Sequence, residues 1–294
     1  MEKDDIVITS AFRTAIGSFN GSLSSKTGPE LGSAVIKKCI ENSELKKEEI
    51  DMVYMGQVLT TGAGQNPARQ ASILAGLSNE TTNTTVNLVC GSGIASVAMA
   101  YNSIKAGDGK VMIAGGQESM SNSPHYMNIR KGIKMGDGKM KDSMIIDGLW
   151  DAYNQYHMGI TAENVAEKFQ IRREEQDSFA AASQRKAAEA IKGKKFVNEI
   201  VPVKVKVKRE EIEFGKDEYP KAESTVEKLA KLRPAFKKDG TVTAGNASGV
   251  NDGAAAVCLM TGEMANKKDI EPLAKIVSWA QCGVDPSIMG TGPI

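Results

Sequence analysis

The sequence predicts an α/β fold in which helices cover a sheet. In the first 117 residues, short β-branched apolar runs alternate with segments whose apolar residues recur at helical spacing, an order typical of a largely parallel sheet with helices on its faces. A chain of 294 residues can form one large or two ordinary domains with a substantial core. Apolar residues make up 41% of the chain and charged residues 25%, as in an average soluble globular protein.

The elements of this first stretch follow from local patterns. Asn66 is a suitable N-cap and Pro67 suits the first helical position, so a helix is expected to begin there. Cys39 falls on the apolar side of an earlier helical pattern and is expected to face the core. Strands are expected at 6–10, 51–59, 84–89 and 110–115, and helices at 29–42, 66–77 and 92–106.

The alternation stops and charge rises between about 117 and 245, which indicates an inserted, less regular subdomain. Amphipathic helices are expected at 162–169 and 174–190, a half-exposed strand at 199–208, a buried strand at 253–261 and a further strand at 273–282. The predicted domains are 1–117 with 246–270, the insertion 118–245, and the beginning of another unit at 271–294.

Composition argues against several classes of function. With 37 basic and 36 acidic residues the net charge is +1, so no global attraction to nucleic acid or anionic membrane is expected. No apolar run approaches about 18 residues, and the acidic first residues do not resemble a signal peptide. Four cysteines without a CxxC pair indicate reduced thiols and a cytoplasmic protein, and two histidines offer few ligands for a metal, so none is expected.

The segment VNLVCGSG, 86–93, brings Cys90 to a glycine-flanked turn between a strand and a helix. Gly91 and Gly93 permit a sharp turn and close approach of a ligand, as at the nucleophile elbows of acyl-transfer enzymes. The start of a helix favours the nucleophilic thiolate, and exchange between two thioesters is nearly isoenergetic. The alternative is a buried structural cysteine, the commoner situation for this residue type and the one expected for Cys258, while Cys282 stays undetermined.

Six segments in order resemble signatures of the thiolase family, and the match covers essentially the whole chain. They are GQVLTTGAGQNPARQA (56–71), VNLVCGSG (86–93), AGGQESMSNSPH (114–125), HMGITAENVAEKF (157–169), RPAFKKDGTVTAGNASGVNDGAA (233–255) and VDPSIMGTGP (284–293). The resemblance implies a layered fold, with a mixed sheet covered by helices and an inserted α+β subdomain that binds coenzyme A.

The resemblance also implies a reaction. Cys90 would take the acetyl group of one acetyl-CoA, and the carbanion of a second would attack the acyl-enzyme to give acetoacetyl-CoA, with thiolysis as the reverse. His157 before Met158 and Gly159 resembles the biosynthetic acetyl-CoA acetyltransferases, with the 3-ketoacyl-CoA thiolases of broader chain length as an alternative. Coenzyme A and its thioesters would be substrates, no permanently bound cofactor is implied, and a homo-oligomer, a dimer or tetramer, is expected.

The residues that match the family's coenzyme A positions are Leu149, His157, Met158, Lys221, Phe236, Ala244, Ser248, Gly249 and Met289. Ordinary structural roles remain open for them. Leu149, Phe236 and Met289 are equally suited to a core, and NASG, 246–249, is equally suited to a turn. Basic residues at 204–209 are typical of a solvated strand face, although they could steer an anionic ligand.

The chain departs from the family pattern in its second half, of which only the beginning, 271–294, is expected. Family segments expected beyond this point, Asn-Glu-Ala-Phe, Gly-His-Pro and a late Cys-x-Gly, have no match, so most of a second half is expected to be absent and an apolar face exposed. Three hypotheses follow: an acetyltransferase whose remaining segments lie outside these residues, a non-catalytic half that binds coenzyme A or assembles with an intact partner, or a condensing enzyme acting on carrier proteins. The intact motifs favour the first.

Overall fold

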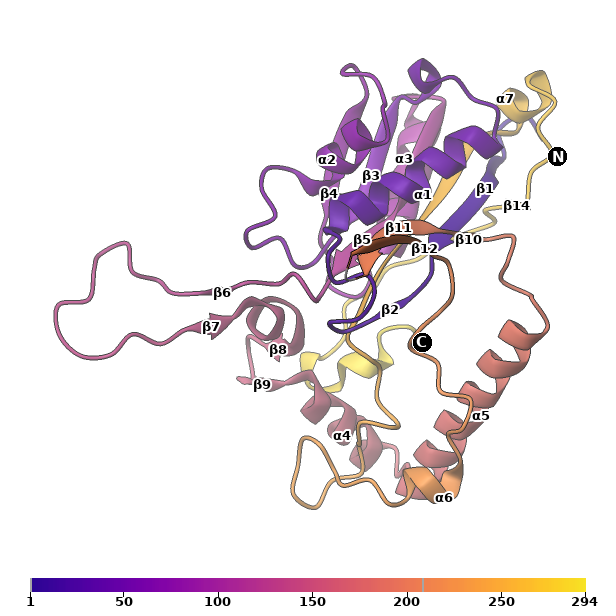
Figure 1. The fold of residues 1–294 in the computed structure, drawn as a ribbon. Coiled ribbons are helices and arrows are strands. Elements are labelled where there is room, and N and C mark those ends of the chain that lie inside the picture. The colour runs from indigo at the N-terminus through magenta and orange to yellow at the C-terminus, as the bar shows by residue number, and fades with distance from the viewer. Residues whose placement is uncertain (1, 208) are drawn as a thin grey trace. The chain divides into compact units, whose positions relative to one another are not determined.

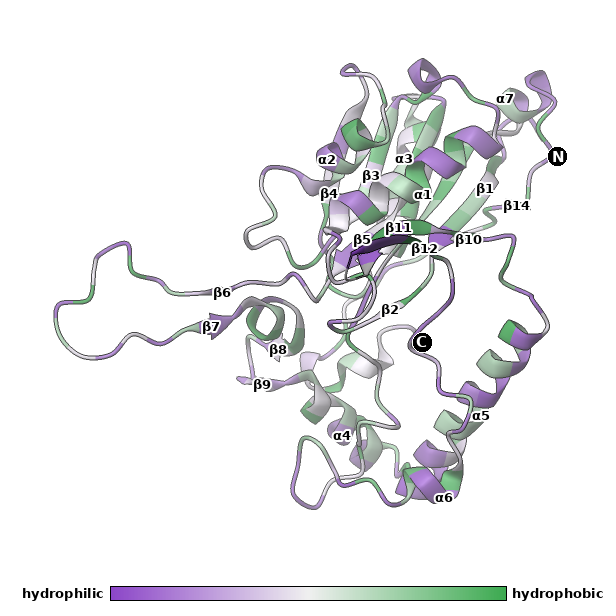
Figure 2. Ribbon diagram, viewed as in Figure 1, coloured by the Kyte–Doolittle hydropathy of each residue, from purple (hydrophilic) through white to green (hydrophobic). Residues whose placement is uncertain are grey.

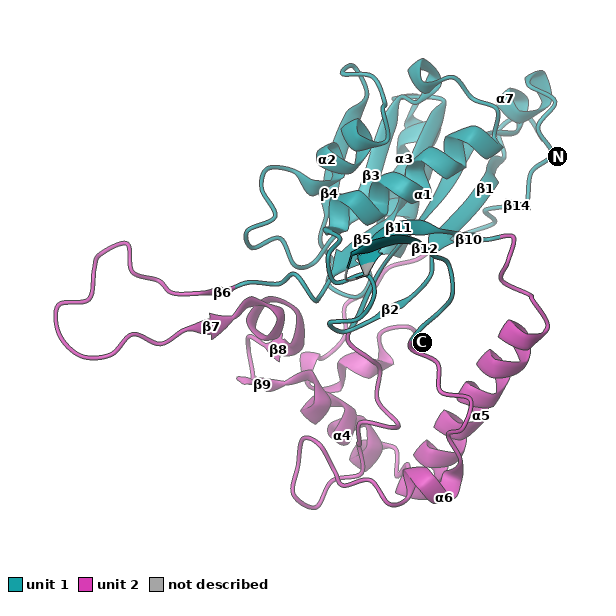
Figure 3. Ribbon diagram, viewed as in Figure 1, with its two compact units in different colours: residues 1–124, 199–218, 251–279 teal, residues 125–198, 219–250, 280–294 magenta. Residues whose placement is uncertain are grey.

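The computed structural model describes residues 2–207 and 209–294, with only the backbone of residue 207, and it divides into two compact units (Figure 3). Unit 1 comprises residues 1–124, 199–218 and 251–279. Unit 2 comprises residues 125–198, 219–250 and 280–294. Both units are therefore assembled from segments distant in sequence.

A mixed sheet forms the centre of unit 1, with the strand order β10-β1-β13-β5-β3-β4 (Figure 1). Its strands are β10 (Ile200–Val201), β1 (Ile6–Thr14), β13 (Asn251–Thr261), β5 (Val111–Ser119), β3 (Met52–Gly56) and β4 (Thr82–Val86). β3 runs parallel to β4 and β5, but β13 is antiparallel to both β1 and β5. The expectation of a largely parallel sheet is therefore wrong at β13, because the chain between β5 and β13 is the long insertion and not the crossover helix that joins parallel neighbours.

Helices cover both faces of this sheet. α1 (Gly28–Asn42) and α2 (Pro67–Leu74) pack on one face, and α3 (Ser92–Ala106) packs on the other. The alternation of β5 supplies both cores, since Val111 and Ile113 join α1 and α2 whereas Met112 joins α3. Figure 2 shows the apolar strands between these helices.

The helix starts in unit 1 follow the sequence signals. The side chain of Asn66 accepts a hydrogen bond from the amide of Arg69 and caps α2, which confirms the predicted start. Thr27 and Glu30 form a capping box at the start of α1. The described part of unit 1 contains four helices of four or more residues, namely α1, α2, α3 and the shorter α7 (Gly262–Lys267).

Residues 199–218 add a hairpin to unit 1 rather than one continuous strand. β10 pairs with β1, and after Pro202 the chain forms β11 (Val203–Val207), which pairs with β12 (Glu210–Phe214). Proline lacks the N–H that a continuous ladder requires. Arg13 fastens this segment to β1 through Glu199 at 2.6 Å and Asp217 at 2.7 Å.

The strand predicted at 273–282 is wrong except for β14 (Ala274–Lys275), which pairs with β1. Beyond it, residues 276–285 form no regular element, and Val277 is 82% exposed. A β-branched apolar run becomes a strand only when a neighbouring strand pairs with it. Two further short elements of this unit are β2 (Gly17–Ser18) and η1 (Lys47–Glu49).

Unit 2 is built from short strands and two principal helices, α4 (Met158–Lys168) and α5 (Arg173–Lys192). α4 begins four residues before its predicted start because His157 caps it. The other elements are β6 (His125–Tyr126), β7 (Lys141–Asp142), the π-helical turn η2 (Met144–Leu149), β8 (Trp150–Asp151), β9 (Tyr156–His157), α6 (Val226–Leu229) and η3 (Pro286–Thr291). Among the described residues, no helix combines the length and apolar character needed to cross a membrane.

Candidate active site

Cys90 is exposed, and it lies in the turn between the end of β4 and the start of α3. The interpretation of Cys90 as a buried structural cysteine is therefore wrong. Cys39 and Cys258 are fully buried, as expected for core residues. Burial raises the pKa of the Cys39 thiol to about 12 and that of Cys258 to about 11, so neither forms a thiolate near neutral pH.

The residue before Cys90 holds the backbone in an unusual conformation. Val89 has a φ of 48°, in the left-handed region that a β-branched residue rarely adopts. Ser92 stabilises this turn, because its hydroxyl accepts a hydrogen bond from the Leu88 amide at 2.9 Å and donates one to the Val89 carbonyl at 2.5 Å. The amide of Val89 also donates to Asn87 Oδ1 at 3.0 Å. Strained residues of this kind cluster at functional sites, where the surrounding structure compensates for their cost.

Glycines allow the start of α3 to lie directly on the sheet. A Cβ added to Gly56, the last residue of β3, would lie 2.7 Å from the backbone of Ser92 and 2.8 Å from that of Gly93. One added to Gly116 on β5 would lie 3.5 Å from the Cα of Gly93. The Cys90 turn therefore depends on backbone-to-backbone packing that only glycine at position 56 permits.

Glu118, on the same face of β5 as Gly116, holds the segment that follows β3. Its carboxylate accepts hydrogen bonds from the amides of Val58 at 2.9 Å and Leu59 at 3.0 Å. Burial raises the pKa of Glu118 above its usual value, although the two amides act in the opposite direction. Parallel β3 and β5 both end at this edge of the sheet, and so does the β4 strand that leads to Cys90.

The nine residues predicted to contact coenzyme A all belong to unit 2. His157 and Phe236 stack with ring centroids 4.8 Å apart, and His157 Nδ1 accepts a hydrogen bond from the Gly159 amide at 3.0 Å. Burial lowers the pKa of His157, which keeps the ring neutral and able to cap α4. Met158 is the first residue of α4, so three of the predicted residues adjoin this helix start.

Two further predicted residues connect to the same helix start or to α4. Leu149 precedes β8, whose Trp150 lies opposite His157 in the β8–β9 pair. Met289 lies in η3, which packs on α4 through a 2.9 Å hydrogen bond from the Asn164 side chain to the Ser287 carbonyl. The alternative of a buried core position is wrong for Met289, which is 37% exposed.

The remaining four predicted residues lie in loops. Ala244, Ser248 and Gly249 belong to the 241–249 segment, where Ala244 and Ser248 are exposed. The backbone amide of Lys221 donates a hydrogen bond to Gln184 Oε1 on α5 at 2.8 Å. Lys221 itself is exposed.

Comparison with known proteins identifies the family. The family model for the thiolase N-terminal domain matches residues 6–263. The chain belongs to the thiolase family. It is 56% identical over 294 residues to an acetyl-CoA acetyltransferase of Rhizobium meliloti, covering 100% of this chain and 75% of that protein. An acetyl-CoA acetyltransferase of Pseudomonas aeruginosa is 55% identical over 292 residues, covering 99% and 74% respectively.

A solved structure of a similar protein has the same fold. The crystal structure of the Bacillus anthracis acetyl-CoA acetyltransferase superimposes with a TM-score of 0.96 at 41% identity, covering 99% of this chain and 74% of that one. The predicted thiolase-like fold of a mixed sheet covered by helices is thereby confirmed.

Three side chains that were not predicted from the sequence hold loops through hydrogen bonds to backbone amides, namely Ser92 and Glu118 in unit 1 and Glu163 in unit 2. Ser92 lies between two glycines, and a serine at such a position could have been predicted to stabilise a turn with its hydroxyl. Glu118 and Glu163 gave no local signal, because their amide partners lie 59 to 79 positions away in the chain.

Proposed function

We propose that this thiolase is an acetyl-CoA C-acetyltransferase that forms acetoacetyl-CoA from two molecules of acetyl-CoA and catalyses the reverse thiolysis. The observation that carries the proposal is the exposed residue Cys90 in a strained turn at the start of α3. The names of the relatives in Rhizobium meliloti and Pseudomonas aeruginosa support the choice of acetyl-CoA as substrate.

In the first half-reaction Cys90 is the nucleophile. Its thiolate attacks the thioester carbonyl of acetyl-CoA, the new C–S bond forms, and the bond to the coenzyme sulfur breaks. The coenzyme leaves as a thiolate and takes up the proton that Cys90 lost. The position at a helix start stabilises the attacking anion, and the exchange of one thioester for another costs little free energy.

In the second half-reaction a carbanion of another acetyl-CoA attacks the acetyl-Cys90 carbonyl. The new C–C bond forms, the bond to Cys90 sulfur breaks, and acetoacetyl-CoA leaves. The proton lost from the methyl carbon must pass to a base. No residue described in this structure is assigned that role.

Coenzyme A is proposed to bind the predicted residues of unit 2. The stacked His157 and Phe236 offer a flat apolar surface, Met158 and Met289 add polarisable thioethers, and Lys221 offers a cation for a phosphate. The reaction as proposed involves no permanently bound cofactor.

Covalent labelling tests the role of Cys90. After incubation with isotopically labelled acetyl-CoA, mass spectrometry of peptides should find one acetyl group on Cys90. Cys282→Ser is a matched control because Cys282 is the other exposed cysteine of the four. Labelling should persist in Cys282→Ser and disappear in Cys90→Ser, and equal labelling of both variants would refute the assignment.

Acyl-chain length is tested with the same assay. Labelling by acetyl-CoA should exceed labelling by a long-chain acyl-CoA at equal concentration. The reverse preference would favour a 3-ketoacyl-CoA thiolase of broader chain length.

We also propose a homo-oligomer in the cytoplasm. β4 lies at the end of the sheet order, so no strand among the described residues pairs with its outer edge, and a second chain could approach it there. The described cysteines form no disulfide, in keeping with a reducing compartment. Light scattering of the purified chain tests the assembly, and a monomer at micromolar concentration would argue against it.

A further inference from the structure

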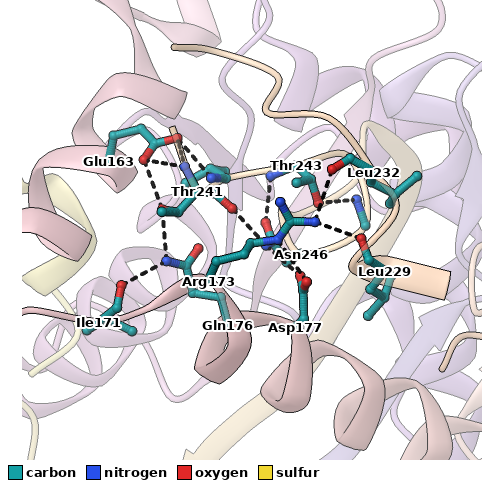
Figure 4. Close-up of polar contacts among 12 residues, drawn as sticks. Glu163, Ile171, Arg173, Gln176, Asp177, Leu229, Leu232, Thr241, Thr243 and Asn246 are labelled. Carbon is teal, nitrogen blue, oxygen red and sulfur yellow. Dashed lines mark hydrogen bonds and ion pairs between the residues drawn. The ribbon is translucent and has the colours of Figure 1, made fainter. Parts of the chain in front are cut away.

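Two carboxylates in unit 2 accept hydrogen bonds from the 241–249 loop (Figure 4). Glu163 comes from α4 and is 5% exposed, and Asp177 comes from α5 and is 1% exposed. Neither is among the residues expected to contact coenzyme A. A carboxylate buried to this degree requires compensating hydrogen bonds or ion pairs.

Glu163 satisfies its charge almost entirely with the main chain of the loop. It accepts hydrogen bonds from the Thr241 amide at 2.8 and 2.9 Å, from the Thr241 hydroxyl at 2.9 Å and from the Val242 amide at 2.8 Å. The same hydroxyl accepts a hydrogen bond from Gln176 Nε2 at 2.9 Å. The beginning of the loop is therefore fixed to α4 and α5 together.

Asp177 fixes the middle of the loop through Asn246. Its carboxylate accepts hydrogen bonds from Asn246 Nδ2 at 2.9 Å and from Arg173 Nε at 2.8 Å. Asn246 Oδ1 in turn accepts from the Thr243 amide at 2.7 Å. Arg173 also donates to the Leu229 carbonyl at 2.7 Å, so the loop and the end of α6 share one anchor.

These contacts divide the loop into an inner and an outer side. Val242 and Thr243 are buried against the anchors, whereas Ala244 and Ser248 are exposed. The segment 241–249 contains no helix or strand beyond an isolated bridge at Thr243. Among the described residues, backbone pairing of the loop is limited to this bridge, where the Ala235 amide donates to the Val242 carbonyl at 2.9 Å. The two carboxylates therefore supply much of what holds the loop in shape.

We propose that Glu163 and Asp177 are positioning residues that hold this loop, before any ligand arrives, in the shape that receives coenzyme A on its outer side. The inference rests on the proposed function for the choice of ligand. A loop fixed in advance loses less conformational entropy on binding. Removal of an anchor lowers the fraction of loops that have the correct shape, and the affinity for coenzyme A falls in proportion to that fraction.

The test uses the whole 294-residue chain with two measurements, hydrogen exchange of the loop amides and the Kd for free coenzyme A by calorimetry. Glu163→Gln replaces an acceptor by a donor beneath two amides. Thr241→Val removes the hydroxyl at nearly constant volume, and Thr241→Ser retains it. Arg185→Gln is the matched control, because it breaks an exposed ion pair on α5 with Glu189 at 3.1 Å that has no contact with the loop.

We expect Glu163→Gln and Thr241→Val to accelerate exchange at 241–246 and to weaken coenzyme A binding about tenfold, the effect of one lost charge-assisted hydrogen bond. Thr241→Ser keeps the hydroxyl, so its loop exchange and its Kd for coenzyme A should match those of the unsubstituted chain. Arg185→Gln should change neither quantity. Unchanged loop exchange in both test variants would overturn the positioning role. Faster exchange with an unchanged Kd would overturn its connection to the ligand. Failure of the unsubstituted chain to bind coenzyme A would count against the proposed function, while the exchange data would still decide whether the anchors hold the loop.

Discussion

Gly56 and Gly93 meet where α3 begins on the sheet, yet alanine at these two positions should have opposite effects. At Gly56 the new methyl would lie 2.7 Å from the backbone of Ser92, against an ordinary carbon contact of about 3.5 Å. At Gly93 the nearest atoms would be 4.0 Å away, which is ordinary van der Waals contact. The neighbours of position 56 are backbone atoms, which cannot rotate away.

Overpacking of this kind costs about 1–3 kcal/mol, a large share of a typical stability of about 5–15 kcal/mol. For a unit of this size Gly56→Ala should lower Tm by roughly 2–12 °C. Gly93→Ala should instead be neutral or stabilise by up to about 1 kcal/mol, because alanine is the better helix former.

Thermal unfolding followed by circular dichroism measures both changes, and acetyl labelling of Cys90 reports whether the turn survives below Tm. Labelling should slow in Gly56→Ala and persist in Gly93→Ala. A neutral Gly56→Ala, or the same loss of Tm in both variants, would refute the argument that close backbone packing seats the Cys90 turn.

Three further predictions concern thiols, pH and an ion pair. A thiol reagent should modify Cys90 in the native chain, but Cys39 and Cys258 only after denaturation. Burial raises the pKa of the Cys39 thiol to about 12 and that of the Cys258 thiol to about 11. Modification of Cys39 or Cys258 in the native chain would contradict their burial. Since burial lowers the pKa of His157 in the folded state, the free energy of unfolding, measured in urea, should fall as the pH drops below about 6.5 towards that lowered pKa. His157→Asn keeps an acceptor that can cap α4 and should make the free energy of unfolding depend less on pH. An unchanged pH dependence would exclude His157 as its source. Arg13→Leu should lower the free energy of unfolding by about 3 kcal/mol in the same urea assay, because it removes the ion-pair partner of the largely buried Asp217 carboxylate. A loss below about 0.5 kcal/mol would show that the pair behaves like an exposed one.

Tertiary structure, and not the local sequence pattern, decided which of two apolar segments forms a long strand. The sequence predicts strands at both 253–261 and 273–282, but only the first lies in a long strand, β13, because β1 and β5 flank it. The second pairs with β1 at Ala274 and Lys275 alone. Strand formation depends on a partner, which a single segment does not encode.

The sequence by itself determined α1, α2 and α3 of unit 1, the cap of α2 and the place of Cys90. Asn66 before Pro67 set the start of α2, and the run VNLVCGSG placed one cysteine between a strand and a helix. These features depend on residues within one or two turns of each other, so local chemistry is sufficient to fix them.

Only the tertiary structure decided that Cys90 is exposed, that β13 is antiparallel, and that Glu163 and Asp177 accept hydrogen bonds from the 241–249 loop. For β13 and for the two carboxylates, the deciding contacts join residues far apart in the chain. Such contacts depend on which surfaces the folded backbone brings together, and no short stretch of sequence carries that information.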